Sequence, residues 1–495
     1  MFQGTGSDVG KSLIVAGLAR LYTRQGLAVR PFKPQNMSNN AAPAVADDPD
    51  AGWGEIGRAQ ALQARAAGLT PHTDMNPVLL KPQSDIGAQL IVNGRVTGNA
   101  DARAYHELKP ELLDGVLDAY QRLAADAELV LIEGAGSPAE VNLRAGDIAN
   151  MGFAEAADVP VTLVGDIERG GVIAALVGTW TLLSSSERAR LAGYIVNRFR
   201  GDVSLFNDAL PIIHEHTGMP SLGVVPWFEA ARDLPAEDTA SLIARYEGTG
   251  WAAAKIRIAV PHLPRIANFD DLDPLSAEPD VALRMVEPGE ELPTDANLIL
   301  LCGSKSTRAD LHALRAAGWA EQIAAAVGRG THVAGICGGF QMLGRSIADP
   351  DGIEGTPGET PGLGLLEVET VIAAEKTLAA VTGNAIESGA LITGFEMHMG
   401  ATRGRDTGRP VIQINTAKSS QADGARSPDD RVLGTYVHGL FNSDDFRHDF
   451  LVRLNPTRGK GLDWDRHIDA VLDRLADHIE EHTDTAQLLT IARHA

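Results

Sequence analysis

Short apolar runs alternate with helical stretches along the first 227 residues of the chain. Residues 129–132, 159–164 and 191–196 are rich in Leu, Val and Ile, as expected of strands buried on both faces of a sheet. Ala- and Leu-rich stretches such as 104–124, which precedes the first of these runs, favour helices. This alternation predicts an α/β fold built on a parallel sheet.

A second series of the same kind starts after a polar segment. Its strands are expected at 255–260, 298–301 and 331–336. Residues 228–254 are acidic and lack a core pattern, so we interpret them as a linker. A polar loop is expected at 419–430.

The end of the chain carries one further helical pattern. Its apolar positions recur at helical spacing and are Ile468, Val471, Leu472, Leu475 and Ile479. This stripe predicts a helix that packs on the second domain. The expected organisation is therefore a first domain at 1–227, a linker at 228–254, a second domain at 255–445 and a helical tail at 446–495.

Composition narrows the functional classes. The chain of 495 residues has a formal net charge of −22, which argues against a general nucleic-acid-binding surface. It contains no apolar stretch long enough to predict a membrane span and opens with no signal peptide. Two cysteines, Cys302 and Cys337, are too few for a disulfide framework, which favours a cytoplasmic location. Nothing in the sequence predicts an oligomeric state.

A glycine-rich loop near the start predicts a phosphate-binding site. It is one residue longer between its outer glycines than the common P-loop and comprises Gly4, Thr5, Gly6, Ser7, Asp8, Val9, Gly10, Lys11 and Ser12. Its amides and the following helix N-terminus would hold the phosphates of ATP. Lys11 would reach the β- and γ-phosphates, and the Ser12 hydroxyl would coordinate Mg²⁺.

The strand expected before this loop is very short, since only Met1, Phe2 and Gln3 precede Gly4. A P-loop normally follows a buried strand. We therefore hypothesise that the natural chain starts upstream, with an additional apolar strand.

Polar residues follow three of the predicted strands, namely Glu133, Asp166 and Asn197. Ligands of open parallel sheets bind beyond the carboxyl ends of the strands. Glu133 is therefore a candidate for Mg²⁺ binding and Asn197 for contact with the nucleotide base. A helix cap is the alternative for Asp166.

The second half contains the pattern of a nucleophile elbow. Cys337 follows a predicted strand, precedes a helix expected at 340–347, and has glycines two residues before and after it. The turn would expose the thiol at a helix N-terminus, which favours thiolate. His438 is the candidate base, with His398 as a competitor, and Gly303 and Gly338 are candidate oxyanion donors. Cys302 lies in an apolar run and is expected to be a core thiol.

These motifs together resemble known families. Cys337, Gln341 and His438 are similar to a class I (triad-type) glutamine amidotransferase domain, and the long P-loop resembles the dethiobiotin synthetase-like fold. The order of the two domains and the segment KPQNMSNN at 33–40 resemble the cobyric acid synthase family, as do IEGAGSPAE at 132–140, GDIERGG at 165–171 and PRIANFDDLDP at 264–274.

The resemblance implies a function. The family amidates the b, d, e and g carboxylates of adenosylcobyrinic acid a,c-diamide with ATP and glutamine, in cobalamin biosynthesis. It implies Cys337 as nucleophile, His438 as base, Gln341 as a glutamine-binding residue and Lys33 as a substrate-binding residue. A Glu that many triad enzymes carry two residues after the His is replaced here by Leu440, so a Cys–His dyad is implied. Lys33, Arg169, Arg198 and Arg200 are candidate contacts to the corrinoid carboxylates, with surface ion pairs as the alternative for the arginines.

Three other functions compete with this one. Cobyrinic acid a,c-diamide synthase has related domains and chemistry. A partitioning-type P-loop switch ATPase would leave the Cys337 elbow unexplained. A scaffold with an inactive amidotransferase half conflicts with the intact pair of Cys337 and His438.

Overall fold

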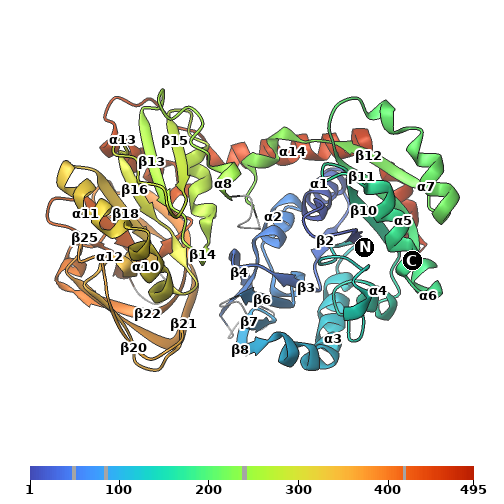
Figure 1. The fold of residues 1–495 in the computed structure, drawn as a ribbon, viewed down its shortest axis with the longest axis horizontal. Helices are drawn as coiled ribbons and strands as arrows, with labels where there is room; N and C mark the ends of the chain where they lie inside the picture. The colour runs from blue at the N-terminus through green and yellow to red at the C-terminus, as the bar shows by residue number, and fades with distance from the viewer. Residues whose placement is uncertain (47–51, 83–86, 237–241, 416–419, 495) are drawn as a thin grey trace. The chain divides into compact units, whose positions relative to one another are not determined.

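The computed structural model describes residues 1–46, 52–82, 87–236, 242–415 and 420–494. They form two compact units, unit 1 with Met1–Pro235 and Ile468–Ala495, and unit 2 with Ala236–His467. Both units are α/β, with parallel sheets, as predicted (Figure 1). The division falls inside the expected linker, whereas the domain boundaries expected at 227, 255 and 446 stay predictions.

A parallel sheet forms the centre of unit 1. Its strands pair in the order β1-β10-β11-β12, and the parallel pair β2-β9 adjoins β1 through a bridge between Phe2 and Glu133. The strands are β1 Phe2–Gly4, β2 Val29–Phe32, β9 Leu129–Ile132, β10 Val161–Asp166, β11 Leu191–Phe199 and β12 Ser221–Pro226. The three strands predicted in this region are confirmed as β9, β10 and β11. The carboxyl ends of β1, β9, β10 and β11 therefore meet along one edge.

The strand before the glycine-rich loop is short but well paired. Phe2, Gln3 and Gly4 lie beside Thr162, Leu163 and Val164 of β10. Phe2 and Gln3 are buried, so three residues are enough to anchor the start of the loop in the sheet. The hypothesis of a further strand upstream stays a prediction.

Helices and two small sheets complete unit 1. The helix expected at 104–124 is present as α3, and the aromatic rings of Phe32, Tyr120 and Phe153 pack beneath it with centroids 5.5–5.6 Å apart. The helices are α1 Lys11–Arg24, α2 Arg58–Ala66, α3 Ala102–Ala125, α4 Met151–Ala156, α5 Val172–Leu182, α6 Ser185–Arg188, α7 Ala209–Thr217 and α15 Thr485–Arg493. The small sheets are β3-β6-β7-β8, with β3 Gln35–Met37, β6 Val78–Pro82, β7 Gly87–Val92 and β8 Arg95–Asp101, and the pair β4 Ala41–Val45 with β5 Trp53–Gly57.

The C-terminal helix α14, Trp464–His482, buries the predicted apolar stripe, but in unit 1. The prediction that it packs on the second domain is wrong for residues from Ile468 onward. Gly17 of α1 lacks a side chain where Ile479 approaches, since a Cβ there would lie 2.8 Å from the Ile479 Cγ1. Arg20 of α1 donates to Asp473 at 2.8 Å, so both shape and charge fit α14 to α1.

Unit 2 contains a mostly parallel sheet and a second, mostly antiparallel one. The first has the order β15-β13-β16-β18-β26-β25 and the second β20-β19-β21-β22-β27, with β23 and β24 added beside β21. The strands are β13 Ile256–Pro261, β14 Ile266–Ala267, β15 Val281–Val286, β16 Leu298–Leu301, β17 Gly303–Ser304, β18 His332–Ile336, β19 Ser346–Asp349, β20 Gly358–Pro361, β21 Val368–Ala385, β22 Leu391–Gly404, β23 Ile412–Asn415, β24 Ser420–Asp423, β25 Ala425–Arg426, β26 Val432–Thr435 and β27 Val437–His438. The helices are α8 Leu242–Arg245, α9 Asp273–Ser276, α10 Thr307–Ala316, α11 Trp319–Arg329, α12 Gly338–Leu343 and α13 Asp444–Leu454. The strands predicted at 255–260, 298–301 and 331–336 correspond to β13, β16 and β18.

Two local expectations for unit 2 are wrong, and a third stretch contributes more to the core than expected. The helix expected at 340–347 ends at Leu343, because Gly344 turns the chain into extended backbone against Val368 and β19 follows. The polar loop expected at 419–430 contains β24 and β25, while residue 419 lies outside the described residues. The stretch interpreted as a linker contributes Leu242 and Tyr246 to the core of unit 2.

Candidate active sites

The glycine-rich loop of unit 1 joins β1 to α1. Gly10 has a left-handed φ of 89°, and a Cβ there would lie 2.2 Å from the side-chain nitrogen of Asn197. Asn197, at the end of β11, donates from Nδ2 to the carbonyl oxygen of Val9 at 2.9 Å. A glycine is therefore required at this position, and Asn197 holds the shape of the loop.

Lys11 lies across this loop rather than in solvent. Its side chain is buried, and its Nζ donates to the carbonyl oxygens of Gly6 and Gly136, each at 3.2 Å. Gly136 belongs to the segment that follows β9. The ammonium group is thus held where the loop amides and the N-terminus of α1 favour a bound anion.

Glu133 gathers three of the residues around this loop. One of its oxygens accepts hydrogen bonds from Ser12 Oγ and Lys33 Nζ, both at 2.8 Å, and the other accepts from Gln63 Nε2 at 2.6 Å. The structure therefore brings together the predicted metal ligands Ser12 and Glu133 with the predicted substrate contact Lys33. Gln63 was not predicted, although Gln60 and Gln63 share one face of α2 where the pattern is otherwise rich in Ala, and both are fully buried.

The charge of Glu133 is maintained by its partners. Burial alone would raise its pKa, but the adjacent Lys33 ammonium and the hydrogen bonds from Lys33, Gln63 and Ser12 lower it below its usual value. Glu133 is therefore a carboxylate at neutral pH. A hydroxyl and a carboxylate at this distance from one another fit the ligand set of Mg²⁺, which takes one or two protein oxygens beside those of a bound phosphate.

The other strand-end residue, Asp166, caps a turn. It accepts from the amide of Glu168 at 2.8 Å, which closes a turn after β10 and is not the helix cap of the alternative, because the next helix, α5, has Gly171 as its N-cap. Arg198 pairs with both Asp166 and Asp8, at 3.1 and 2.7 Å. Arg169 likewise pairs with Asp8 at 3.1 Å, and Arg200 pairs with Glu168 and stacks on Trp227. The three arginines expected near the corrinoid thus have carboxylate partners, as the surface ion-pair alternative predicts.

The nucleophile elbow of unit 2 has the strained geometry that its sequence predicts. Cys337 joins β18 to α12 with φ 53° and ψ −108°, a backbone conformation rare for residues other than glycine. A Cβ at Gly339 would lie 2.1 Å from the carbonyl oxygen of Leu301, and one at Gly335 would lie 2.6 Å from Gly339. The flanking glycines are therefore required for the turn that presents the sulfur.

His438 faces Cys337 and is held from behind by a carboxylate. Its Nδ1 lies 2.7 Å from Oδ2 of Asp271, and Asp271 Oδ1 also accepts from the amide of Gly439 at 2.6 Å. The ring stacks on Phe395 with centroids 5.2 Å apart. The expected Cys–His dyad is thus incomplete, because Asp271 supplies the third group that Leu440 cannot.

Asp271 was missed by the sequence reasoning although a signal was present. It lies in the 3₁₀ turn Phe269–Leu272, within the PRIANFDDLDP segment that carries the family resemblance. Asp270 and Asp271 adjoin each other there, and both are buried in a turn that a sequence alone does not direct toward a histidine 167 residues later. Their burial was not predictable from the pattern.

The surroundings of His438 favour its protonated form. Burial lowers the pKa of the imidazole, but the Asp271 carboxylate and the hydrogen-bonded Cys337 sulfur raise it above the usual value. An imidazolium between a carboxylate and a thiol stabilises the thiolate, which is the nucleophilic form of cysteine.

The two candidate oxyanion donors lie on either side of Cys337. Gly338 is the first residue of α12, so its amide has no acceptor within the helix. A Cβ at Gly338 would lie 2.8 Å from the amide of Ser304, and one at Gly303 would lie 3.0 Å from Cε1 of His438. The backbone of β17 therefore passes close to both the elbow and the histidine.

Gln341 is buried beneath the elbow. Its Nε2 donates to Met399 O at 3.1 Å and to Tyr436 Oη at 3.2 Å, and its Oε1 accepts from Thr307 at 3.0 Å. These bonds link α12 to β22 and α10. The role of Gln341 in holding glutamine stays a prediction, and the contacts suit a residue that shapes the pocket from below.

The competing candidates do not take the place of His438 or Cys337. His398 stacks on Tyr436 with centroids 3.8 Å apart, and its Nε2 lies 3.7 Å from Glu396. Cys302 is buried in the core of unit 2, and burial raises the pKa of its thiol. It is therefore the core thiol that was expected.

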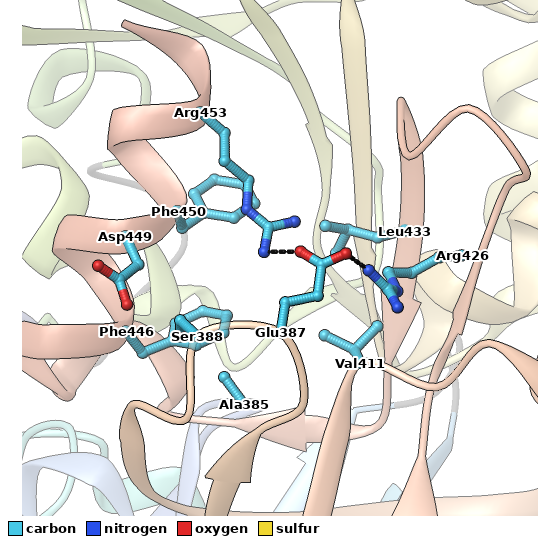
Figure 2. A pocket seen from close by; sticks show the side chains of 10 residues that line it. All are labelled: Ala385, Glu387, Ser388, Val411, Arg426, Leu433, Phe446, Asp449, Phe450 and Arg453. Atoms are coloured by element: carbon cyan, nitrogen blue, oxygen red, sulfur yellow. Dashed lines mark ion pairs between the residues drawn. The ribbon is translucent and has the colours of Figure 1, made fainter. Parts of the chain in front are cut away.

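A small cavity elsewhere in unit 2 is lined by charged side chains that pair with one another. Figure 2 shows Glu387 reaching between Arg426 and Arg453, with which it forms ion pairs. The cavity measures about 20 Å³, room for about one water molecule. Its charged groups neutralise one another, so it offers no site for a substrate.

Two features are absent from the described residues. No group of three or more His, Cys, Asp or Glu residues among them could hold a metal ion on its own. Across the same described part of the chain, no helix is both long and apolar enough to cross a membrane.

Comparison with known proteins agrees with the geometry. Residues 1–242 match the CobQ/CobB/MinD/ParA nucleotide binding domain, and residues 257–446 match the CobB/CobQ-like glutamine amidotransferase domain. A cobyric acid synthase of Methylorubrum populi is 56% identical over 100% of this chain and 99% of its own. Proteins of the same name from Bradyrhizobium diazoefficiens and Rhodobacter capsulatus are 55% and 54% identical, each over 100% of this chain and 99% of their own.

Proposed function

Because the chain belongs to the cobyric acid synthase family, we propose that its two sites divide one amidation reaction between them. The protein is a glutamine-dependent amidoligase that amidates adenosylcobyrinic acid diamide in cobalamin synthesis. Unit 2 would release ammonia from glutamine, and unit 1 would activate the acceptor carboxylates, at the b, d, e and g positions, with ATP. The observation that carries this proposal is the Asp271–His438 pair beside Cys337, on a chain that also folds a nucleotide loop.

The first step in unit 2 is attack on glutamine. The Cys337 thiolate adds to the side-chain amide carbon, and the oxyanion that forms is stabilised by amides of Gly338 and Gly303. The His438 imidazolium gives its proton to the departing nitrogen, so that ammonia leaves and a γ-glutamyl thioester remains. Asp271 keeps the ring oriented with Nε2 toward the sulfur.

Hydrolysis then regenerates the thiol. His438, now neutral, takes a proton from water while the hydroxide adds to the thioester carbonyl. The products are glutamate and the Cys337 thiolate, with the proton left on His438. Glutamine and water have thus become glutamate, ammonia and a proton that the new carboxyl group releases to solvent, and the ion pair is restored.

In unit 1 an acceptor carboxylate attacks the γ-phosphorus of ATP, which yields ADP and an acyl phosphate. The loop amides, the N-terminus of α1 and Lys11 would stabilise the charge that develops on the transferred group. Ammonia then displaces phosphate from the acyl carbon and leaves the amide. Asn197, which fixes the loop through Val9, is the proposed contact for the base.

Mg²⁺ fits this site through Ser12 and Glu133, and when bound it would neutralise charge on the phosphates. Lys33 shares the Glu133 carboxylate with Ser12. We propose that Lys33 turns toward the acceptor carboxylate once Glu133 has another cationic partner. Glu133 would thus exchange Lys33 for Mg²⁺ as its cationic partner.

Two of the competing functions have less support. A partitioning-type ATPase has no use for a glutamine amidotransferase domain, which this chain contains. Cobyrinic acid a,c-diamide synthase shares the chemistry but differs in the acceptor, and the full-length relatives named above are cobyric acid synthases.

One experiment tests the proposed function directly. The purified protein is incubated with ATP, Mg²⁺ and glutamine, together with either cobyrinic acid or its a,c-diamide, and the products are identified by mass spectrometry. We expect the diamide alone to gain amides, up to cobyric acid. Turnover of only the unamidated acid would contradict the proposal.

A further inference from the structure

A large cavity in unit 1 adjoins the nucleotide loop. Its volume is about 580 Å³, and its wall includes Ser7 of the loop, Gly136 and Ser137 after β9, and Lys109 of α3. Pockets of roughly 300–1,000 Å³ bind small molecules and cofactors. A ligand in this cavity would therefore lie within reach of the transferred phosphate.

The segment KPQNMSNN contributes to this cavity through alternate side chains. Strand β3 places Gln35 and Met37 in the wall, and Met37 is 55% exposed. Asn36 points the other way, where it is buried and donates to Gln60 at 2.9 Å. The segment KPQNMSNN thus contains residues that stabilise the fold, such as Asn36, and residues that face the cavity, such as Gln35 and Met37.

Part of the cavity wall consists of apolar side chains that are exposed and not packed in the core. Met37 and Leu143 are 55% and 50% exposed, and both line the cavity beside Leu80 and Pro82. Large apolar side chains exposed together on one surface mark a binding site. The broad apolar face of a corrin ring fits such a wall.

Two basic side chains of the cavity wall, Arg144 and Lys109, differ in their ion-pair partners. Arg144 is neutralised by ion pairs with Asp147, Glu155 and Glu187. Lys109 has no ion-pair partner among the described residues, and its Nζ lies 5.5 Å from the centroid of the Tyr105 ring. Tyr105 Oη is buried and, within the described part of the chain, has no hydrogen-bond partner.

Three carboxylates also line the cavity and limit where an anion can bind. Asp101 caps the start of α3 by accepting from the amides of Arg103 and Ala104, and Asp147 is paired with Arg144. Glu140 lies beside Gly136, at the loop end. The place for a second anion is therefore the α3 side, at Lys109.

We propose that this cavity is the corrinoid acceptor site and that Lys109 is a positioning residue that holds one carboxylate of the acceptor. A second carboxylate of the same molecule then lies at the phosphate loop, where it is activated. The proposal rests on the proposed function, since it assumes the same acceptor. It adds Lys109 as a specific contact for one carboxylate. With that carboxylate held, different orientations of the same corrin ring would place different carboxylates at the phosphate loop.

The test compares Lys109→Gln with Lys109→Arg and with Arg103→Gln, a control that removes the same charge from an exposed position of α3 outside the cavity wall. Corrinoid binding is measured by equilibrium dialysis, and KM and kcat are measured with saturating ATP and glutamine. Two ligands are used: the a,c-diamide, in which the b, d, e and g carboxylates are free, and cobyric acid, in which these four groups are amides.

For Lys109→Gln we expect Kd and KM for the diamide to rise about tenfold, as for loss of one charge-assisted hydrogen bond. Binding of cobyric acid and kcat should change little, and Lys109→Arg and Arg103→Gln should behave like the unaltered protein. An unchanged diamide Kd, or an equal loss for both ligands, would overturn the role of Lys109.

A second variant tests the cavity independently. Met37→Asp places an anion on the exposed apolar wall and should weaken binding of both corrinoids, while ATP binding is retained. Unchanged corrinoid binding by this variant would exclude the cavity as the acceptor site. If the unaltered protein bound the diamide but did not amidate it, the proposed function would fail separately from this inference.

Discussion

Asp271 Oδ2 lies 2.7 Å from Nδ1 of His438, so residues 167 positions apart in the chain meet beside Cys337. The carboxylate both orients the ring and stabilises its protonated form. The position of a Glu two residues after the histidine, which other triad enzymes use, is here occupied by Leu440, which is buried. A carboxylate from a different part of the sequence thus occupies the place behind the histidine.

Asp271→Asn should lower glutamine-dependent turnover by about 10²–10⁴-fold, the range of a general acid–base contribution. The amide keeps the size of the side chain but removes the charge that favours imidazolium. Activity with ammonium chloride as nitrogen donor should remain, because the nucleotide site is unaltered. Steady-state assays with each donor check both parts, and equal losses with the two donors would contradict the assignment.

Lys11→Ala should abolish amidation with either nitrogen donor. Its Nζ is held over the loop by Gly6 and Gly136, so its loss removes a cation from the site of phosphoryl transfer. Glutaminase activity without corrinoid should persist and serves as the folding control. Ammonia-dependent amidation by this variant at the normal rate would remove Lys11 from the mechanism.

Glu133→Gln should reduce amidation with both donors and raise the Mg²⁺ concentration needed for half-maximal activity. The neutral amide loses attraction for the metal and for Lys33, which is buried beside it at 2.8 Å. A titration of MgCl₂ at fixed ATP measures the effect. The same metal dependence in the variant as in the unaltered protein would exclude Glu133 as a ligand.

Asp423 gives unit 2 a pH-dependent stability. Burial, chiefly, raises its pKa to about 6. In the unfolded chain the same carboxyl ionises near pH 4 (about 3.9), so the folded state retains a proton that the unfolded state has lost. Stability should therefore fall as pH rises from about 4 to about 6, by up to about 1.4 kcal/mol per pH unit, and then level off.

Asp423→Asn should remove the contribution of Asp423, while those of Asp310 and Glu354, whose pKa values burial raises to about 6 and about 7, remain. Thermal unfolding of the variant and the unaltered protein is compared at several pH values between 4 and 8, and the difference in midpoint is plotted. We expect the variant to gain stability relative to the unaltered protein as pH rises toward about 6. A difference that stays constant with pH would show that Asp423 ionises normally in the folded protein.

Local chemistry was predictable from the sequence where a motif fixes the backbone. The glycines around Cys337 and within the nucleotide loop occupy turns that a residue with a side chain would not fit. Their positions in the sequence therefore predict the geometry of these turns. Buried strands such as β9 and β16 were predictable because continuous apolar runs have few alternatives.

Long-range relationships were not predictable in the same way. Asp271 meets His438, and Gln63 meets Glu133, only because the fold brings separate elements together. The apolar stripe of α14 predicted a buried helix but not its partner, which is α1 of unit 1. A hydrophobic pattern predicts that one face of a helix is buried, but it does not predict which element packs against that face.

The central claim is that Cys337 frees the nitrogen that the nucleotide site attaches to the corrinoid. Glutamine labelled with ¹⁵N in its side-chain amide is supplied together with unlabelled ammonium, ATP and the a,c-diamide, and the isotope in the product is measured by mass spectrometry. We predict ¹⁵N in the new amides formed by the unaltered protein, and only unlabelled amides from Cys337→Ala. Labelled amides from the Cys337→Ala variant, or amide formation without ATP, would contradict the account.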